Sequence, residues 1–236
     1  MKCLGVIGGM SWESTLLYYR HLNQGVAARL GGLHSARLLL HNVDFAAVAA
    51  LQAAHDWDAA AALLAEAAQG LRAAGAQGLL IAANTMHKVA DAVQRAAGLP
   101  LLHIADATAA AVRAAGGVSR VGLLGTRYTM EDPAIVQQRL QQLGLQVIVP
   151  DEADRGPVHR IIYDELCRGV VTEASRRAYV DVIGRLQQRG AQGVVLGCTE
   201  IALLIDAASS PLPVFDSAAL HAAAAVDWML DEETTA

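Results

Sequence analysis

Two similar halves follow one another along the chain, and this internal repeat restricts the possible folds more than any other feature. Gly8 and Gly125 each end a short apolar run, while Ala83 and Cys198 each follow a second apolar run. Gly8 and Ala83 are 75 positions apart, and Gly125 and Cys198 are 73 positions apart. The same order of parts at nearly equal spacing indicates a duplicated unit, with a site built from matching loops of the two halves.

Strand-like apolar runs alternate with helical patterns over the whole length of the chain. This alternation is typical of α/β proteins with parallel sheets. We expect strands near residues 3–7, 36–42, 77–82, 100–104, 120–124, 146–149, 193–197 and 212–215. We expect helices near residues 12–29, 57–74, 86–96, 105–115, 130–143, 157–168, 173–189 and 217–230.

The repeat predicts two pseudosymmetric α/β lobes, each with a parallel sheet flanked by helices. The first lobe is expected to hold residues 1–102 together with 209–236, because the last strand and helix are expected to return to it. The second lobe is expected to hold residues 103–208. Ligands of open α/β sheets bind at the carboxyl ends of the strands, so we expect an active site in a cleft between the lobes.

Composition excludes several classes of function. The 236 residues are 54% apolar, and a net charge of −5 without a basic cluster argues against nucleic acid as a partner. No apolar run is long enough to span a bilayer and no signal-peptide pattern is present, so a cytoplasmic protein is expected. The three cysteines and eight histidines show no metal-ligand spacing, so no metal site is predicted.

Cys198 is the main candidate for chemistry. It lies where a strand is expected to meet a helix, and a helix N-terminus lowers the pKa of a thiol and favours a thiolate. The alternative is that Cys198 is a small buried apolar residue. Asn84, Thr85 and Thr199 add amide and hydroxyl donors suited to a substrate carboxylate, although such residues also cap helices.

The sequence supports no organic cofactor. The glycine turns do not form a GxGxxG or Walker A pattern, which argues against a nucleotide. The only lysines are Lys2 and Lys88, and neither lies where a pyridoxal phosphate Schiff base is expected. An enzyme acting on amino acids with this sequence is therefore expected to work without a cofactor.

Five motifs together resemble the aspartate/glutamate racemase family, and the resemblance covers nearly the whole chain. Within that family the chain is most similar to bacterial enzymes that act on aspartate and glutamate, including a branch selective for the L-enantiomer. The motifs are Gly-Gly-Met-Ser-Trp-Glu-Ser-Thr at 8–15, Val-Asp-Phe at 43–45, Asn-Thr-Met-His at 84–87, Gly-Thr-Arg-Tyr-Thr at 125–129 and Gly-Cys-Thr-Glu at 197–200.

The resemblance implies a two-lobed fold, catalysis without pyridoxal phosphate, a small acidic amino acid as substrate and often a homodimer. In the family, one group removes the α-proton and a second returns a proton to the opposite face, from the positions of Cys198 and Ala83. Both are cysteines in most members, and the residue at the position of Ala83 is a threonine in the L-selective branch. The resemblance also implies that the substrate is surrounded by Met10, Gln52, Ala83, Asn84, Thr85, Thr126, Thr199 and Glu200.

Ala83 departs from the family pattern, because a methyl group can neither take nor give a proton. Three explanations stay open at this point. Residue 83 is an introduced substitution that impairs turnover, or water or a hydroxyl of Thr85 or Thr126 is the second donor. Alternatively, the chain is a one-cysteine decarboxylase of the arylmalonate type. A non-catalytic amino-acid-binding protein of the same fold is a further alternative to the predicted racemase.

Overall fold

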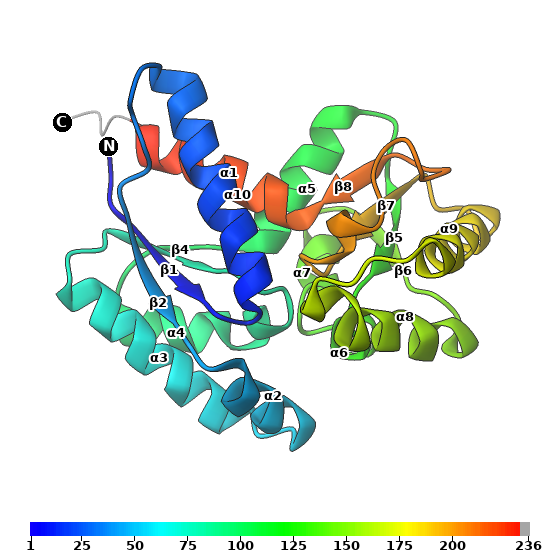
Figure 1. Cartoon of the computed structure of the whole chain (residues 1–236), viewed down its shortest axis with the longest axis horizontal. Helices are drawn as coiled ribbons and strands as arrows, with labels where there is room; N and C mark the ends of the chain where they lie inside the picture. Colours follow the sequence, from blue (N-terminus) through cyan, green and yellow to red (C-terminus); the bar gives the residue numbers. More distant parts are fainter. Residues whose placement is uncertain (232–236) are drawn as a thin grey trace. The chain divides into compact units, whose positions relative to one another are not determined.

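The computed structural model describes residues 1–231, which divide into two compact units (Figure 1). Unit 1 comprises Met1–His103 together with the C-terminal residues from His221, and unit 2 comprises Ile104–Leu220. No helix within residues 1–231 is long and apolar enough to cross a membrane.

Unit 1 contains a four-stranded parallel sheet in the order β2-β1-β3-β4. Its strands are β1 (Leu4–Gly8), β2 (Leu38–Asn42), β3 (Gly78–Ile81) and β4 (Leu101–Leu102). Its helices are α1 (Trp12–Leu30), α2 (Phe45–Ala53), α3 (Trp57–Ala73), the 3-10 helix η1 (Thr85–Val89), α4 (Ala90–Ala97) and most of α10 (Ser217–Leu230).

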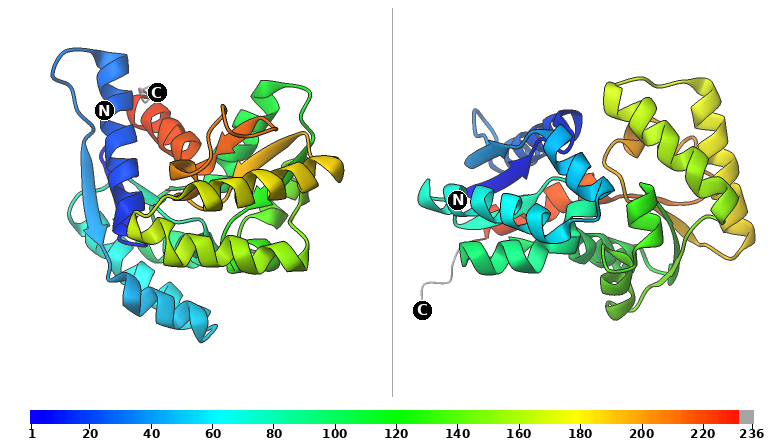
Figure 2. Two further views of the ribbon diagram at one scale, coloured as in Figure 1. Left: turned by 45° about the vertical axis from the view of Figure 1, so that its right-hand side comes forward. Right: turned by 90° about the horizontal axis from the view of Figure 1, so that it is seen from below.

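Both faces of the first sheet are covered, because successive residues of a strand point to opposite sides. A Cβ atom added at Gly5 of β1 would contact Leu71 of α3, whereas one added at Gly8 would contact Thr15 of α1. One core therefore lies between the sheet and the helices α3 and α4, and α1 covers the other face. Figure 2 shows helices on both sides of the sheet within this unit.

Unit 2 contains a second four-stranded parallel sheet in the order β6-β5-β7-β8. Its strands are β5 (Arg120–Leu124), β6 (Gln146–Ile148), β7 (Gly193–Leu196) and β8 (Val214–Asp216). Its helices are α5 (Ile104–Ala115), α6 (Arg127–Glu131), α7 (Gln137–Gln142), α8 (Glu152–Asp164), η2 (Leu166–Arg168), α9 (Glu173–Gln188) and η3 (Ile201–Leu203).

The second sheet also separates two apolar cores. Val121 and Leu123 of β5 pack into a cluster with residues of α5 and α7. Leu124 of the same strand and Leu196 of β7 belong to a cluster with residues of α8 and α9. Because both faces are buried, these strands read as continuous apolar runs in the sequence.

The two sheets have the same strand order when the strands are numbered from the start of each unit, which confirms the predicted duplicated α/β fold. Three local predictions differ from the structure. Helix α2 was not predicted, and the helix expected over 130–143 is divided into α6 and α7. The strand near 212–215 was expected in the first lobe, but β8 pairs with β7 in unit 2. Of residues 209–236, the last five lie outside the described residues.

Strand β8 joins the second sheet for a simple physical reason. Val194, Val195 and Leu196 of β7 pair in parallel register with the three residues of β8, which supplies backbone hydrogen bonds to the free edge of β7. The chain therefore continues the second sheet before α10 begins.

The loops that follow β5 and β7 approach each other closely. The N–H of Gly197 donates a hydrogen bond of 2.6 Å to the carbonyl oxygen of Leu124. A Cβ atom at Gly125 would lie 2.9 Å from the carbonyl oxygen of Gly197. Only a residue without a side chain allows this separation, because a real Cβ would push the two backbones apart.

Gly125→Ala is expected to lower the free energy of unfolding by about 1–3 kcal/mol, the usual cost of overpacking. Urea unfolding followed by circular dichroism measures this change. Gly184→Ala in α9 is the matched control, since a Cβ there meets nothing within 4 Å. It should raise the free energy of unfolding by about 0.5–1 kcal/mol through helix propensity. Equal stability of Gly125→Ala and the unchanged chain would contradict the steric argument.

Candidate active site

The candidate residues of unit 2 lie in two loops at the carboxyl ends of its central strands. Leu124 and Leu196 are register partners at the ends of β5 and β7. Thr126 follows β5 and accepts the N–H of Thr129 at 3.3 Å as the N-cap of α6. Cys198, Thr199 and Glu200 follow β7, and all of these candidate side chains are buried.

Glu200 is the centre of the polar contacts in this loop. The residue is 2% exposed. One oxygen, Oε2, accepts hydrogen bonds from the Cys198 thiol at 3.0 Å and from the Thr199 hydroxyl at 2.8 Å. The other oxygen, Oε1, lies 3.8 Å from the sulfur of Cys167, the middle residue of η2. The buried negative charge is therefore compensated by short-range donors, as burial requires.

The prediction of a lowered thiol pKa at Cys198 is wrong. Burial, followed by the charge of Glu200, raises the pKa of Cys198 well above its usual value. The helix that was expected to start after Cys198 is the three-residue 3-10 helix η3, which begins only at Ile201. Three peptide units supply too small a dipole to offset a neighbouring carboxylate. The resting side chain is accordingly a thiol that donates to Glu200.

Two phenols and a second sulfur, that of Cys167, lie near the pair formed by Cys198 and Glu200. Burial is the largest cause that raises the pKa of Tyr163, Tyr179 and Cys167, and the negative charge of Glu200 contributes to each. All three therefore stay protonated near neutral pH. The hydroxyl of Tyr179 donates to the carbonyl of Val158 at 3.0 Å, which fixes its ring in the core of unit 2.

The Thr126 loop is held by a histidine of α8. The N–H of Arg127 donates to Nδ1 of His159 at 3.2 Å, so this nitrogen carries no proton. Burial and the charge of Arg127 lower the pKa of His159, while Glu131 and Asp164 oppose this shift. The imidazole ring lies between the rings of Tyr128 and Tyr163. A neutral imidazole thus accepts the first N–H of α6.

The candidate residues of unit 1 lie in the corresponding places. Met10 follows β1, and Ala83, Asn84 and Thr85 follow β3; all are buried. Gln52 projects from α2, a helix absent from the sequence prediction, and its Nε2 lies 3.1 Å from the sulfur of Met86. This contact joins α2 to the loop after β3.

The sequence suggested that the Asn84 side chain caps the following helix, and the structure shows no such cap. Asn84 precedes η1 but makes no side-chain capping hydrogen bond, and its backbone is already helical. His87 closes the turn instead. Its Nδ1 lies 2.8 Å from the carbonyl oxygen of Ala83, and its N–H donates to the carbonyl of Asn84 at 3.0 Å.

His87 and Cys167 are the contacting residues that sequence reasoning missed. Cys167 is 33 positions from Glu200, and only the fold brings the two together. His87 is four positions after Ala83, a spacing typical of a side chain that bonds back to a turn, and this signal was present in the sequence.

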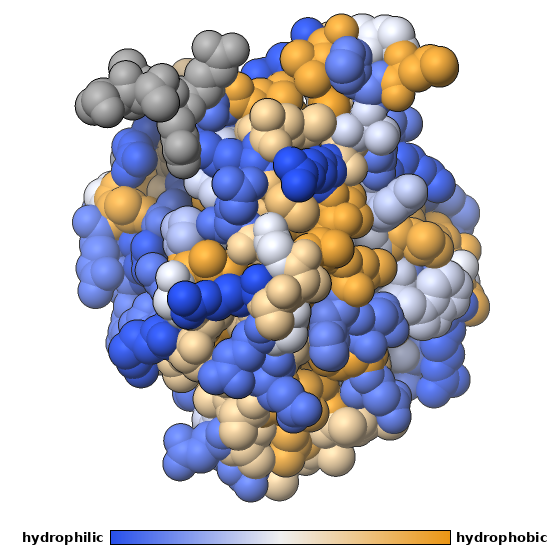
Figure 3. Space-filling model, turned by 90° about the vertical axis from the view of Figure 1, so that its left-hand side faces the viewer, coloured by the Kyte–Doolittle hydropathy of each residue, from blue (hydrophilic) through white to orange (hydrophobic). Residues whose placement is uncertain are grey.

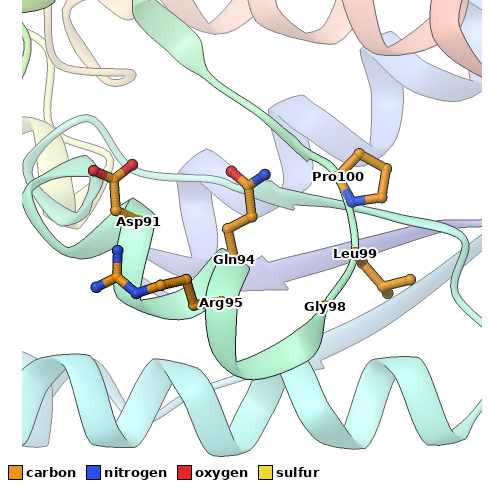
Figure 4. Close-up of a pocket in the computed structure, with 6 residues that line it drawn as sticks. All are labelled: Asp91, Gln94, Arg95, Gly98, Leu99 and Pro100. Carbon is orange, nitrogen blue, oxygen red and sulfur yellow. The ribbon is translucent and has the colours of Figure 1, made fainter.

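No group of three or more histidine, cysteine, aspartate or glutamate residues is arranged for a metal ion within the described part of the chain. A surface hollow of ≈ 570 Å³ does occur in unit 1 (Figure 4). It is lined by Asp91, Gln94 and Arg95 of α4 and by the turn from Gly98 to Pro100. That turn precedes β4, so the hollow lies at the opposite end of the parallel strands from the candidate loops.

Comparisons with known proteins agree with this architecture. The family model for Asp/Glu/hydantoin racemase matches residues 7–225. The chain is 54% identical to a Yersinia pestis protein of known structure described as a putative Asp/Glu racemase, with a TM-score of 0.90 and coverage of 98% of this chain and 100% of the other. It is 33% identical to an aspartate racemase homologue from Pyrococcus horikoshii, with a TM-score of 0.82 and coverage of 98% and 100%.

A more distant structure shares the fold. The aspartate racemase of Picrophilus torridus is 23% identical, with a TM-score of 0.75 and coverage of 97% of this chain and 94% of that one. The match of the family model over nearly the whole length, together with the duplicated sheets, places this chain in the Asp/Glu/hydantoin racemase family.

Proposed function

We propose that this protein removes the α-proton of an acidic amino acid, aspartate or glutamate, as a racemase that needs no pyridoxal phosphate. The contact of 3.0 Å between the Cys198 thiol and the buried carboxylate of Glu200 carries the proposal. It supplies a proton acceptor and a transferable proton in one loop.

The first step is a proton transfer within this pair. The Cys198 proton moves to Oε2 of Glu200, which leaves a thiolate and a neutral carboxylic acid. The thiolate then takes the proton from Cα of the substrate, and the electron pair of the C–H bond moves into the substrate carboxylate as an enediolate. The raised pKa of Cys198 makes its thiolate a strong base once formed.

Donors in the loops after β3, β5 and β7 stabilise the charge that develops on the substrate carboxylate. We assign this role to the amide and hydroxyl groups of Asn84, Thr85 and Thr126, and to the Thr199 hydroxyl once protonation of Oε2 releases it from Glu200, with Met10 and Gln52 as further substrate contacts. All six are buried, and hydrogen bonds from fixed donors to a developing negative charge are strong when water is excluded.

Residue 83 determines whether the reaction inverts the substrate. The methyl group of Ala83 offers no proton, so the carbanion is reprotonated by Cys198 from the face that lost the proton. Once the proton on Cys198 has exchanged with solvent, this return replaces the α-proton by a solvent proton and retains configuration, unless a water molecule or a hydroxyl supplies the opposite face.

The proposal is tested by following α-proton exchange of L- and D-glutamate and aspartate in deuterated buffer by proton NMR. We expect exchange with the unchanged chain, and a rate at least about 100-fold lower in Cys198→Ala and in Glu200→Gln, since each loses one member of the proton-transfer pair. Cys3→Ala removes another buried cysteine and should leave the rate unchanged.

Exchange by Cys198→Ala at the original rate would overturn the assignment of the base. No exchange in the unchanged chain would exclude α-proton chemistry. Calorimetry with the same amino acids, and assays with an arylmalonate, would then separate simple binding from one-cysteine decarboxylation.

A donor at residue 83 is expected to convert exchange into racemisation. Ala83→Cys and Ala83→Thr should produce the opposite enantiomer, detected by chiral chromatography, while Ala83→Val should not. Valine has nearly the shape of threonine but no transferable proton, so it controls for the added volume. Racemisation by Ala83→Val, or by the unchanged chain at the same rate as Ala83→Cys, would show that residue 83 is not the second donor position.

We also propose that the protein forms a homodimer through an apolar face of unit 1. Trp12, Leu16 and Tyr19 recur at one side of α1 and are 58%, 52% and 54% exposed. Tyr19 and Leu40 of the edge strand β2 line the same small depression. Figure 3 looks onto unit 1, where orange apolar side chains lie among blue charged ones. Exposed apolar side chains grouped on one side of a helix are typical of protein interfaces.

Leu16→Glu is expected to shift the protein from dimer to monomer, because a dimer would have to bury the added charge. Light scattering coupled to size-exclusion chromatography measures the mass directly. Gln24→Glu places the same charge elsewhere on α1 and should leave the mass unchanged. A monomeric unchanged chain, or a dimeric Leu16→Glu variant, would contradict the assignment of this face.

A further inference from the structure

Four buried ring side chains from separate segments meet in unit 1. They are Tyr18 of α1, His87 of η1, His103 after β4 and His221 of α10, and none is more than 8% exposed. The ring of His87 lies 4.5 Å from that of His103 and 5.6 Å from that of His221, measured between centroids. A cluster of imidazoles inside a small unit needs defined hydrogen bonds, because unpaired ring nitrogens are costly to bury.

The carbonyl partners fix which ring nitrogens carry protons. A carbonyl oxygen only accepts, so Nδ1 of His87 must donate to Ala83, at 2.8 Å. In the same way, Nε2 of His221 donates to the carbonyl of Leu102 at 2.8 Å. Burial favours a neutral ring, so Nδ1 of His221 accepts the hydroxyl proton of Tyr18 at 2.9 Å.

His87 therefore clamps two successive peptide units of the loop after β3. Its side chain holds the carbonyl of Ala83, and its own N–H holds the carbonyl of Asn84. In a trans peptide the carbonyl and the next N–H point in opposite directions. Turning both carbonyls toward His87 consequently directs the N–H groups of Asn84 and Thr85 away from it.

We propose that His87 is a positioning residue that orients the backbone N–H groups of Asn84 and Thr85 toward the substrate carboxylate. This inference rests on the proposed function for the identity of the ligand. The orientation itself rests only on the two hydrogen bonds of His87. Tyr18 hydrogen-bonds to His221, whose ring lies next to that of His87. These two residues contribute to the stability of the cluster without contacting the Ala83 carbonyl.

Two variants of His87 separate positioning from packing. In His87→Asn, the side-chain nitrogen occupies nearly the place of Nδ1 and restores the donor to Ala83. In His87→Gln, the amide lies one bond further from the backbone, near the place of Nε2, and does not. Tyr18→Phe is a matched control, since it removes one hydroxyl from the cluster and leaves the bond from His87 to Ala83 in place.

The first readout is the amide NMR signals of Asn84 and Thr85 in 15N-labelled protein, which needs no activity. We expect large shifts and at least about 10-fold faster amide hydrogen exchange at these two residues in His87→Gln. The loss of one hydrogen bond, about 1.4 kcal/mol, corresponds to this factor. His87→Asn and Tyr18→Phe should leave the two amides within about threefold of the unchanged chain.

The second readout is the apparent KM for glutamate or aspartate in the α-proton exchange assay. His87→Gln should raise KM at least about 10-fold, His87→Asn should restore it to within about threefold, and Tyr18→Phe should lower thermal stability without moving KM. The inference is overturned if His87→Gln leaves the two amides unchanged. It is also overturned if Tyr18→Phe moves the amides as much as His87→Gln does. If the unchanged chain neither exchanges nor binds these amino acids, the proposed function fails while the amide measurement still decides the role of His87.

Discussion

The burial of one carboxylate governs the chemistry of unit 2. A charged group that is 2% exposed persists in a protein only where donors replace its water, and Glu200 has donors on both oxygens. Burial, followed by this same charge, raises the pKa of Cys198 and Cys167, which keeps both thiols protonated and able to donate. The buried carboxylate and its hydrogen-bond donors thus stabilise each other. Removing the carboxylate leaves the donors buried without their acceptor, and removing a donor leaves the carboxylate buried without that hydrogen bond.

Strand order places the loop that holds Glu200 beside the loop that holds Thr126. In a parallel sheet the loops after neighbouring strands emerge at one edge, and β5 and β7 are neighbours. The glycines at 125 and 197 then allow the two loops to touch, so that Thr126 and the Cys198 segment lie on adjacent backbones. In unit 1, β1 and β3 are neighbours in the same way, and duplication has supplied a second loop pair of different composition.

Much of the fold was readable from the sequence because buried parallel strands form continuous apolar runs. All eight predicted strands correspond to observed ones. Helix α2 was missed because its sequence is almost uniformly apolar and alanine-rich, so it has no polar face to produce a helical period. The assignment of β8 to the first lobe was wrong because the free edge of β7 decides which sheet β8 joins. Pairing between segments that are distant in the chain cannot be read from the local sequence.

The candidate site was less predictable than the fold, for a reason visible at Cys198. Its position after a strand was correctly located, but the direction of its pKa shift depended on Glu200 and on the shortness of η3. A sequence shows that Glu200 is two positions away, and it does not show whether the two side chains turn toward each other. Contacts such as that between Cys167 and Glu200 require the tertiary structure.

The loop after β3 illustrates how a site tolerates an alanine at a position suited to chemistry. The bond from His87 reaches the carbonyl of Ala83, and every residue type has that carbonyl. Exchanging the side chain at residue 83 therefore leaves the orientation of the following amides unchanged. In the proposed reaction, proton donation at residue 83 and carboxylate binding by the backbone N–H groups are therefore separable, because the first depends on the side chain at residue 83 and the second on His87. A chain with alanine at this position keeps the hydrogen bond from His87 on which the proposed carboxylate binding rests.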